Sequence, residues 1–149
     1  MKNISLEING VLFDKLTVAE NHQDMTEGLE NRTQMDADEG MIYVFDSDSD
    51  IAFVNENRWL DIDMIMVDGQ GKITAVHTMK KAVFKDDETE EEHLASRPYY
   101  PSSAPYQYVF ELKSGMAKKS MQKSASVWML IMLNCTRSAM LTTSAMHFN

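Results

Sequence analysis

Residues 60–77, which read LDIDMIMVDGQGKITAVH, decide the fold class of this chain. The part from Leu60 to Val67 first alternates polar and apolar residues and then becomes wholly apolar, as expected of a strand that passes from a half-exposed to a buried position. Residues 68–71 hold two glycines and an aspartate, which is the composition of a tight turn, and the run 72–76 returns from it. The stretch therefore predicts a β-hairpin.

A second hairpin is predicted at the N-terminus. Residues 3–8 alternate in polarity, which is typical of a half-buried strand. Asn9 and Gly10 follow, and this pair readily adopts the two positive φ angles of a type I′ turn. We expect the hairpin to cover residues 3–19.

A short helix is expected after this hairpin, at about residues 21–30. Asn21 with Asp24 three residues later is a variant of the capping box, with Asp in place of Glu or Gln. Thr17 with Glu20 forms a competing capping box four residues earlier. The sequence alone leaves both starts open.

Further strands are predicted at residues 41–45, from residue 51 onward, and at 106–112, with a polar turn at 46–50. The predicted fold class is therefore α+β and β-rich, with an antiparallel barrel-like or sandwich core and one or two short helices. We expect Tyr106 and Tyr108 to share one face of the last strand.

Residues 78–105 form a long excursion between two predicted strands. Six of the nine residues in 85–93 are acidic, so we expect a solvated acidic loop that includes His93. Three prolines and several tyrosines follow, a composition that suits either packing or a partner-binding loop at 85–105. Long loops of this kind are often functional.

The C-terminal part differs in charge from the rest of the chain. Residues 1–111 hold all 23 acidic and 9 of the 14 basic residues, a net charge of −14, whereas residues 112–149 carry +5. We therefore expect one β-rich domain over residues 1–119 and an atypical extension over 120–149. Two interpretations of the extension stay open: a non-native tail from a displaced reading frame, and a divergent extension that forms a dimer contact.

Composition limits the classes of partner and compartment. The net charge of the 149 residues is −9, and an acidic protein repels nucleic acid. Cys135 is the only cysteine, and no basic segment followed by an apolar run marks a secretory signal at the N-terminus. The longest apolar run, Val127–Leu133, is too short to cross a bilayer. We expect a cytoplasmic protein that binds neither nucleic acid nor a membrane.

Four stretches between residues 16 and 119 follow the order and spacing of a known family pattern. They are residues 18–32 with Gly28, Leu29 and Arg32, residues 38–45, the set Phe53, Asn57, Asp63, Asp68 and Gly71, and residues 108–115. On these stretches the chain resembles the family called domain of unknown function 192. The resemblance implies a compact, barrel-like β-rich domain with one or two short helices and no established activity. At the family's central motif, Val54, Asn55 and Glu56 stand where Trp, Met and Lys are expected, and Asp61 replaces Pro.

Metal and cofactor motifs are weak. Asp46, Asp48 and Asp50 resemble the start of a calcium-binding EF-hand loop, but Ile51 stands where its Gly should be and Asn57 where its Glu should be. The four histidines lack the spacing of a zinc helix, and the chain has no phosphate loop and no nucleophile elbow. We therefore expect no metal, no cofactor and no catalytic residue.

Five polar residues are the candidates for a ligand-binding site: Arg32, Glu39, Asn57, Asp63 and Glu111. Asp63 lies in an apolar strand, so its carboxylate needs a partner or a cavity, and the Arg32 guanidinium is a suitable one. One interpretation is an ion pair that fixes the helix on the sheet. The other is a polar pocket for a small anionic or carbohydrate-like ligand.

These observations predict a non-catalytic module that binds a small ligand or a protein partner, with a homodimer as a further candidate assembly. The alternative is an enzyme of unknown reaction with a polar cleft around Asp63 and Arg32. The two hypotheses differ in geometry, because an enzyme needs Asp63, Arg32 and Glu111 to converge on one concave site.

Overall fold

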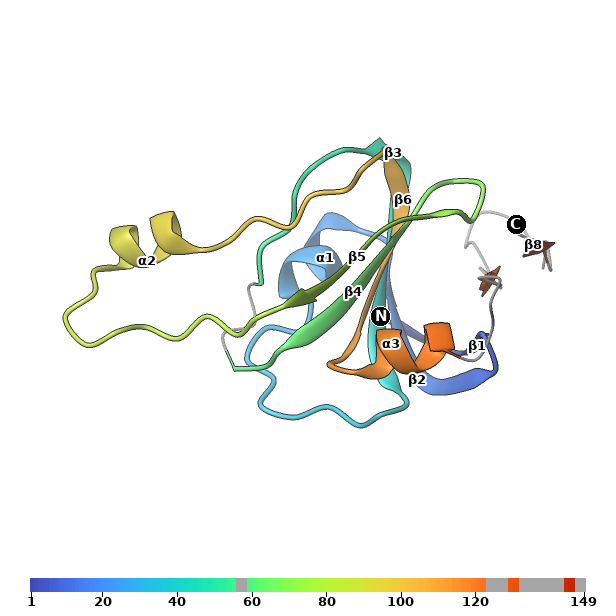
Figure 1. Ribbon diagram of the computed structural model, residues 1–149, viewed down its shortest axis with the longest axis horizontal. Coiled ribbons are helices and arrows are strands. Elements are labelled where there is room, and N and C mark those ends of the chain that lie inside the picture. The colour runs from blue at the N-terminus through green and yellow to red at the C-terminus, as the bar shows by residue number, and fades with distance from the viewer. Residues whose placement is uncertain (56–58, 123–128, 132–143, 147–149) are drawn as a thin grey trace.

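The computed structural model describes residues 1–55, 59–122, 129–131 and 144–146 (Figure 1). Its strands are β1 (Lys2–Ile8), β2 (Val11–Ala19), β3 (Glu39–Ser49), β4 (Ile62–Val67), β5 (Ile73–Met79), β6 (Tyr106–Lys113), β7 (Met129–Ile131) and β8 (Ser144–Met146). Its helices are α1 (His22–Glu27), α2 (Glu90–Ser96) and α3 (Met116–Gln122).

The strands form a single sheet in the order β5-β4-β6-β3-β2-β1-β7-β8. All neighbouring strands are antiparallel except β2 and β3, which are parallel and are connected through α1. The sheet is strongly twisted and does not close into a barrel (Figure 1). The β-rich α+β class is confirmed, and three short helices accompany the strands in the described residues.

Both predicted hairpins are confirmed. β1 pairs with β2 up to Ile8 and Val11, and Asn9 and Gly10 between them have φ angles of 49° and 79°. β4 pairs with β5, and the Asp68 carboxylate accepts hydrogen bonds from the backbone N–H groups of residues 70 and 72. The turn residues thus fix both registers through local geometry.

The structure decides between the two predicted helix starts. Asn21 is the N-cap of α1, and its side-chain oxygen accepts a hydrogen bond from the Asp24 N–H at 2.9 Å. Thr17 lies instead within β2. The helix ends at Gly28, whose φ of 44° favours glycine over residues with a side chain.

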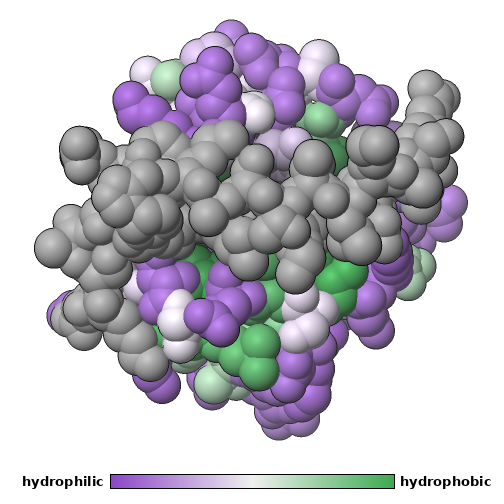
Figure 2. Space-filling model, turned by 90° about the vertical axis from the view of Figure 1, so that its right-hand side faces the viewer, coloured by the Kyte–Doolittle hydropathy of each residue, from purple (hydrophilic) through white to green (hydrophobic). Residues whose placement is uncertain are grey.

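The sheet buries apolar side chains on both faces. One cluster joins side chains of β1 and β2 to those of β4, β6 and α3 and includes Phe13, Ile65 and Phe110. The second lies on the opposite face, beneath α1, and includes Met64 and Val109. In the view onto the β1 side, hydrophobic residues gather in the lower centre of the face, and hydrophilic residues lie along its top, right and bottom edges (Figure 2).

Two predictions around β3 are wrong. Residues 46–49 are not a turn, because β3 continues to Ser49, where it pairs with Tyr106. No strand starts at residue 51 in the described part of the chain, since Phe53 makes only an isolated bridge to Tyr100. The alternating Asp and Ser residues of 46–49 have the composition of a turn but follow an exposed strand.

Tyr106 and Tyr108 do not share a face of β6. Tyr106 belongs to the core cluster beneath α1, whereas Tyr108 packs against the cluster on the other face. The reason is an irregularity in the ladder, because the β3–β6 register shifts between Val44 and Ser49.

Residues 80–105, which we call the arm, project from the sheet and carry α2 (Figure 1). The expectation that His93 lies in a solvated acidic loop is wrong, because its side chain is only 3% exposed. Its ring stacks on Phe84 with centroids 3.9 Å apart, and its Nδ1 lies 3.1 Å from Glu88 Oε2. The acidic composition of this segment gave no indication that the His93 side chain is buried.

The predicted domain boundary at residue 119 falls inside α3, which packs Met116 and Ala117 into the core. β7 adds to the edge of the sheet at β1, and it lies within the apolar run 127–133. Most of the predicted extension lies outside the described residues. No helix in the described ranges is long and apolar enough to span a membrane.

Candidate functional site

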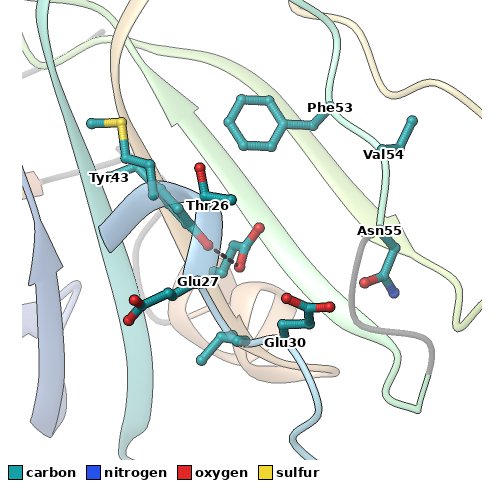
Figure 3. Close-up of a pocket in the computed structure, with 11 residues that line it drawn as sticks. Thr26, Glu27, Glu30, Tyr43, Phe53, Val54 and Asn55 are labelled. Atoms are coloured by element: carbon teal, nitrogen blue, oxygen red, sulfur yellow. Dashed lines mark hydrogen bonds between the residues drawn. The ribbon is translucent and has the colours of Figure 1, made fainter. Parts of the chain in front are cut away.

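A pocket of about 80 Å³ opens between α1 and the segment 53–55, above β3 and β6 (Figure 3). Side chains of α1 flank one side and Phe53, Val54 and Asn55 flank the other. The lining residues are Met25, Thr26, Glu27, Gly28, Leu29, Glu30, Tyr43, Phe53, Val54, Asn55 and Glu111.

The polar centre of this pocket is the pair Tyr43 and Glu111. The Tyr43 hydroxyl donates a hydrogen bond of 3.0 Å to Glu111 Oε2, and both side chains are buried. Their strands place them on one face of the sheet, because Tyr43 follows Met41 by two residues and Met41 pairs with Glu111. Among the described residues, this hydroxyl is the one hydrogen-bond donor to the Glu111 carboxyl.

Burial raises the pKa of Glu111 to about 7, because the charged carboxylate loses its hydration, and the Tyr43 hydrogen bond offsets part of this rise. Burial together with the nearby Glu111 charge raises the pKa of Tyr43 well above its ordinary value. Tyr43 therefore stays a hydroxyl donor at neutral pH, while Glu111 lies near the midpoint of its titration.

Aromatic packing and a glycine hold Tyr43 in place. The Tyr43 and Phe53 rings meet edge to face, with centroids 6.1 Å apart. On the other side, a Cβ atom on Gly28 would lie 2.6 Å from the Tyr43 hydroxyl oxygen. The end of α1 can therefore approach the hydroxyl only because residue 28 has no side chain.

Asn55 fixes the segment that forms the far side of the pocket. Its amide nitrogen donates to the carbonyl oxygens of Leu60 at 2.8 Å and Lys80 at 3.1 Å. These bonds connect the segment to the start of β4 and to the base of the arm. Asn55 thus has a structural role in shaping the pocket.

The charge of the pocket is negative. Glu27, Glu30 and Glu111 line it, and none of its lining residues is Lys, Arg or His. An anionic ligand would meet three carboxyl groups with no cation to compensate, so the arrangement disfavours the anionic ligand expected from the sequence.

The structure separates the five predicted site residues. Glu111 is in the pocket, whereas Asp63 faces the opposite side of the sheet, because it pairs with Leu112 and its neighbour Met64 pairs with Glu111. Asn57 lies outside the described residues.

The expected ion pair between Arg32 and Asp63 is wrong. The Arg32 guanidinium donates to the Glu39 carboxylate at the protein surface, so the two predicted residues pair with each other. Neither lines the pocket. Asp63, Arg32 and Glu111 do not converge, and this geometry gives no support to an enzymatic cleft around Asp63 and Arg32.

Asp63 is buried with its hydrogen bonds satisfied. Its carboxylate accepts hydrogen bonds from the Thr78 hydroxyl at 2.8 Å, from Gly115 N at 2.8 Å and from Ala117 N at 3.0 Å. The last two donors lie at the N-terminal end of α3, where a negative charge is stabilising. Asp63 therefore attaches α3 to β4.

Sequence reasoning missed Tyr43, Gly28 and Asn55 as pocket residues. Tyr43 sits in the apolar run 41–45 and carries no signal that separates it from a core tyrosine. One signal in the sequence could have identified Asn55 as a special residue, because it is polar at a position where the resembled family has an apolar residue.

No group of three or more His, Cys, Asp or Glu side chains suited to a metal ion occurs in the part of the chain that the structure describes.

The comparisons with known proteins agree with the fold. Residues 4–127 match domain of unknown function 192, a family described as Uncharacterized ACR. The chain belongs to this family.

Two solved structures are similar to this member of domain of unknown function 192. A protein of unknown function from Novosphingobium aromaticivorans has a TM-score of 0.62 and 20% identity, with 80% of this chain and 79% of that chain covered. A protein from Sinorhizobium meliloti, whose name proposes a transcription regulator, has a TM-score of 0.57 and 22% identity, with 80% and 84% covered. At these identities the likeness shows the fold alone. No curated protein matches the sequence.

Proposed function

We propose that this protein is a non-catalytic binding module whose pocket takes the cationic head group of a small amine. The observation that carries the proposal is the buried Glu111 carboxyl, which receives one hydrogen bond from Tyr43 in a pocket lined by no basic residue. A buried carboxylate with a single donor gains most from a ligand that brings positive charge and further N–H donors.

The walls of the pocket suit the same class of ligand. Glu27 and Glu30 add negative charge beside the opening, and the rings of Tyr43 and Phe53 can attract a cation through their π faces. A volume of about 80 Å³ is several times the roughly 10–15 Å³ that a cavity needs to hold one water molecule. An ammonium group with one or two carbon atoms fits, and the rest of a larger ligand would extend into solvent.

Binding of a cation should be coupled to the ionisation of Glu111. The ammonium charge favours the carboxylate and therefore lowers the pKa of Glu111 from about 7. Binding then releases a proton at neutral pH, and affinity should rise as the pH increases from about 6 to about 8, a range in which an alkylamine stays charged.

The test is an NMR titration of the full chain with methylammonium and ethanolamine, with acetate and glucose as comparison ligands. We expect the two amines to shift the amide signals of residues 25–30 and 53–55, and Glu111→Gln to weaken this binding at least tenfold. Glu7→Gln, which removes an exposed carboxylate from β1, is the matched control and should bind as the wild type does.

Acetate binding without amine binding would contradict the proposal, and glucose binding would favour a carbohydrate ligand instead.

We also propose a cytoplasmic location, which the presence of only one cysteine supports. The net charge of −9 supports neither nucleic acid nor an anionic membrane as a partner.

A further inference from the structure

The arm exposes large apolar side chains far from the sheet. Val83, Phe84, Leu94 and Tyr99 are all exposed, and Tyr99 reaches 69%. In Figure 1 the arm extends away from the strands, with α2 near its far end. Several exposed apolar side chains on one projecting element suit a surface that a partner covers.

Local interactions order the arm without help from the main core. Thr89 and Glu92 form a complete capping box at the start of α2. His93 is sandwiched between its contacts with Phe84 and Glu88. The arm therefore holds its shape before a partner arrives, which lowers the entropic cost of binding.

Hydrogen bonds of Tyr100 also hold the base of the arm in place. The Tyr100 hydroxyl accepts a hydrogen bond from Lys80 N at 3.1 Å, and the Tyr100 backbone exchanges two hydrogen bonds with Phe53. These hydrogen bonds attach the end of the arm at Tyr100 to Phe53 and to Lys80 at the start of the arm.

The surface that surrounds these apolar residues is acidic. Six carboxyl residues occur between positions 86 and 92, and Glu90, Glu91 and Glu92 are exposed on the first turn of α2. A partner for the arm should therefore combine an apolar recess with positive charge.

The same chain carries a recess of that kind at the base of the arm. Met35, Trp59 and Leu60 provide its apolar wall, Lys81 and Lys113 its basic side chains, and its volume is about 300 Å³. We call this recess, together with Asp61 and Ser114, the Trp59 groove. Trp59 itself is 58% exposed.

One acidic residue, Asp61, lines the Trp59 groove, and a second, Asp36, lies near enough to Lys113 to feel its charge. Asp61 accepts hydrogen bonds from Lys80 Nζ at 3.2 Å and from Lys81 N at 2.8 Å. Asp36 pairs with Lys15 at 2.9 Å. With two lysines, Lys81 and Lys113, against one aspartate, Asp61, the lining of the groove carries one net positive charge.

We propose that the arm of one copy docks in the Trp59 groove of a second copy, so that two chains form a two-fold homodimer. The apolar side chains of the arm match the wall of the groove, and the acidic turn of α2 matches Lys81 and Lys113. Because the groove lies at the root of the arm, each copy can offer its arm and receive the other in the same contact.

The experiment is sedimentation velocity on the full chain over a range of concentrations, with charge-reversed variants. We expect the wild type to dimerise, and both Glu90→Lys with Glu91→Lys and Lys81→Glu with Lys113→Glu to be monomers. An equimolar mixture of the two variants should recover the dimer, because the reversed arm then meets the reversed groove while the other contact pairs the native arm with the native groove. Glu7→Lys with Lys72→Glu reverses exposed charges away from both surfaces and should dimerise as the wild type does.

Circular dichroism of each variant shows whether it is folded, so that loss of the dimer can be separated from loss of structure. A wild type that stays monomeric at every concentration overturns the proposal. So do folded charge-reversed variants that still dimerise, or a mixture that stays monomeric. The pocket at Glu111 shares no lining residue with the groove, so amine binding can succeed or fail independently of this result.

Discussion

Asp63 and Glu111 are two buried carboxyl groups on neighbouring strands, and they face opposite sides of one sheet. Asp63 accepts three hydrogen bonds, two of them from the backbone at the start of α3. Among the described residues, Glu111 accepts a hydrogen bond from Tyr43 alone, and it lies in a pocket. Burial alone therefore does not indicate the role of an acidic residue, because the number of hydrogen-bond donors around the carboxyl group decides that role.

The consequence for function follows from this difference in hydrogen bonding. A carboxylate with its donors in place stabilises the fold and has little left to offer a ligand. A carboxyl group that is buried with few donors is destabilising when it is charged, and a ligand with N–H donors and positive charge relieves that cost. Asp63 is therefore a structural residue in this account, and Glu111 is the binding residue.

The largest effect should come from Asp63→Ala. This change leaves the buried N–H group of Ala117 and the part-buried N–H group of Gly115 without an acceptor, and an unsatisfied buried group costs about 1–3 kcal/mol. We expect the free energy of unfolding, measured by urea denaturation, to fall by about 4 kcal/mol. Asp63→Asn keeps one acceptor oxygen and should lose less, and a loss below about 1 kcal/mol for the alanine variant would contradict the assigned role.

Glu111→Gln should act in the opposite direction. Folding raises the pKa of Glu111 from 4.5 to about 7, so the folded state binds the proton more tightly than the unfolded chain does. The contribution of Glu111 to stability therefore falls as the pH rises from about 4.5 to about 7 and stays low above that range.

A neutral glutamine at position 111 removes this pH-dependent loss of folding stability. Above pH 7 we expect Glu111→Gln to unfold with a free energy up to about 3 kcal/mol higher than that of the wild type, at roughly 1.4 kcal/mol per pKa unit. Urea denaturation at a series of pH values measures the difference between the two proteins. A difference that does not change between pH 4.5 and 7 would show that Glu111 has an ordinary pKa.

Gly28→Ala should have an intermediate effect and links the helix end to the pocket. The added Cβ would meet the Tyr43 hydroxyl, and the φ of 44° is strained for alanine. We expect a loss of about 2 kcal/mol by urea denaturation, together with weaker amine binding.

Gly115→Ala provides the matched control, because Gly115 also has a positive φ, of 93°, but nothing lies within 4 Å of its added Cβ. It should lose about 1 kcal/mol through backbone strain and leave amine binding unchanged. Equal losses in the two variants, with equal amine affinities, would mean that the contact with Tyr43 has no role in the pocket.

The smallest effect is expected for Arg32→Ala. The Arg32 side chain is 43% exposed, and exposed ion pairs contribute roughly 0–1 kcal/mol. We expect a change of about 0.5 kcal/mol or less in unfolding free energy and no change in amine binding. A large drop in amine affinity would return Arg32 to the binding site that the sequence suggested.

The parts of the fold that were predicted correctly depend on local sequence. The Asn9-Gly10 turn, the Asp68 turn and the Asn21 cap each act within a few residues, so their signals are readable along the chain. The family resemblance extended the prediction of a β-rich domain over residues 16–119, because it compares many such local signals in order.

The parts that failed depend on contacts between distant segments. Whether Arg32 meets Asp63 or Glu39 is decided by the path of the chain after α1, which the residue types do not specify. The role of Tyr43 depends on Glu111, 68 positions later. His93 looked solvated because its neighbours are acidic, while the stacking on Phe84 that buries it is invisible in composition.

The most direct test of the central claim is a ¹³C NMR titration that follows the side-chain carboxyl of Glu111 between pH 4 and pH 9. We expect a midpoint near 7, its absence in Glu111→Gln, and a downward shift when methylammonium is added. A midpoint near the ordinary value of about 4.5, unchanged by methylammonium, would contradict the assignment of Glu111 as the binding residue.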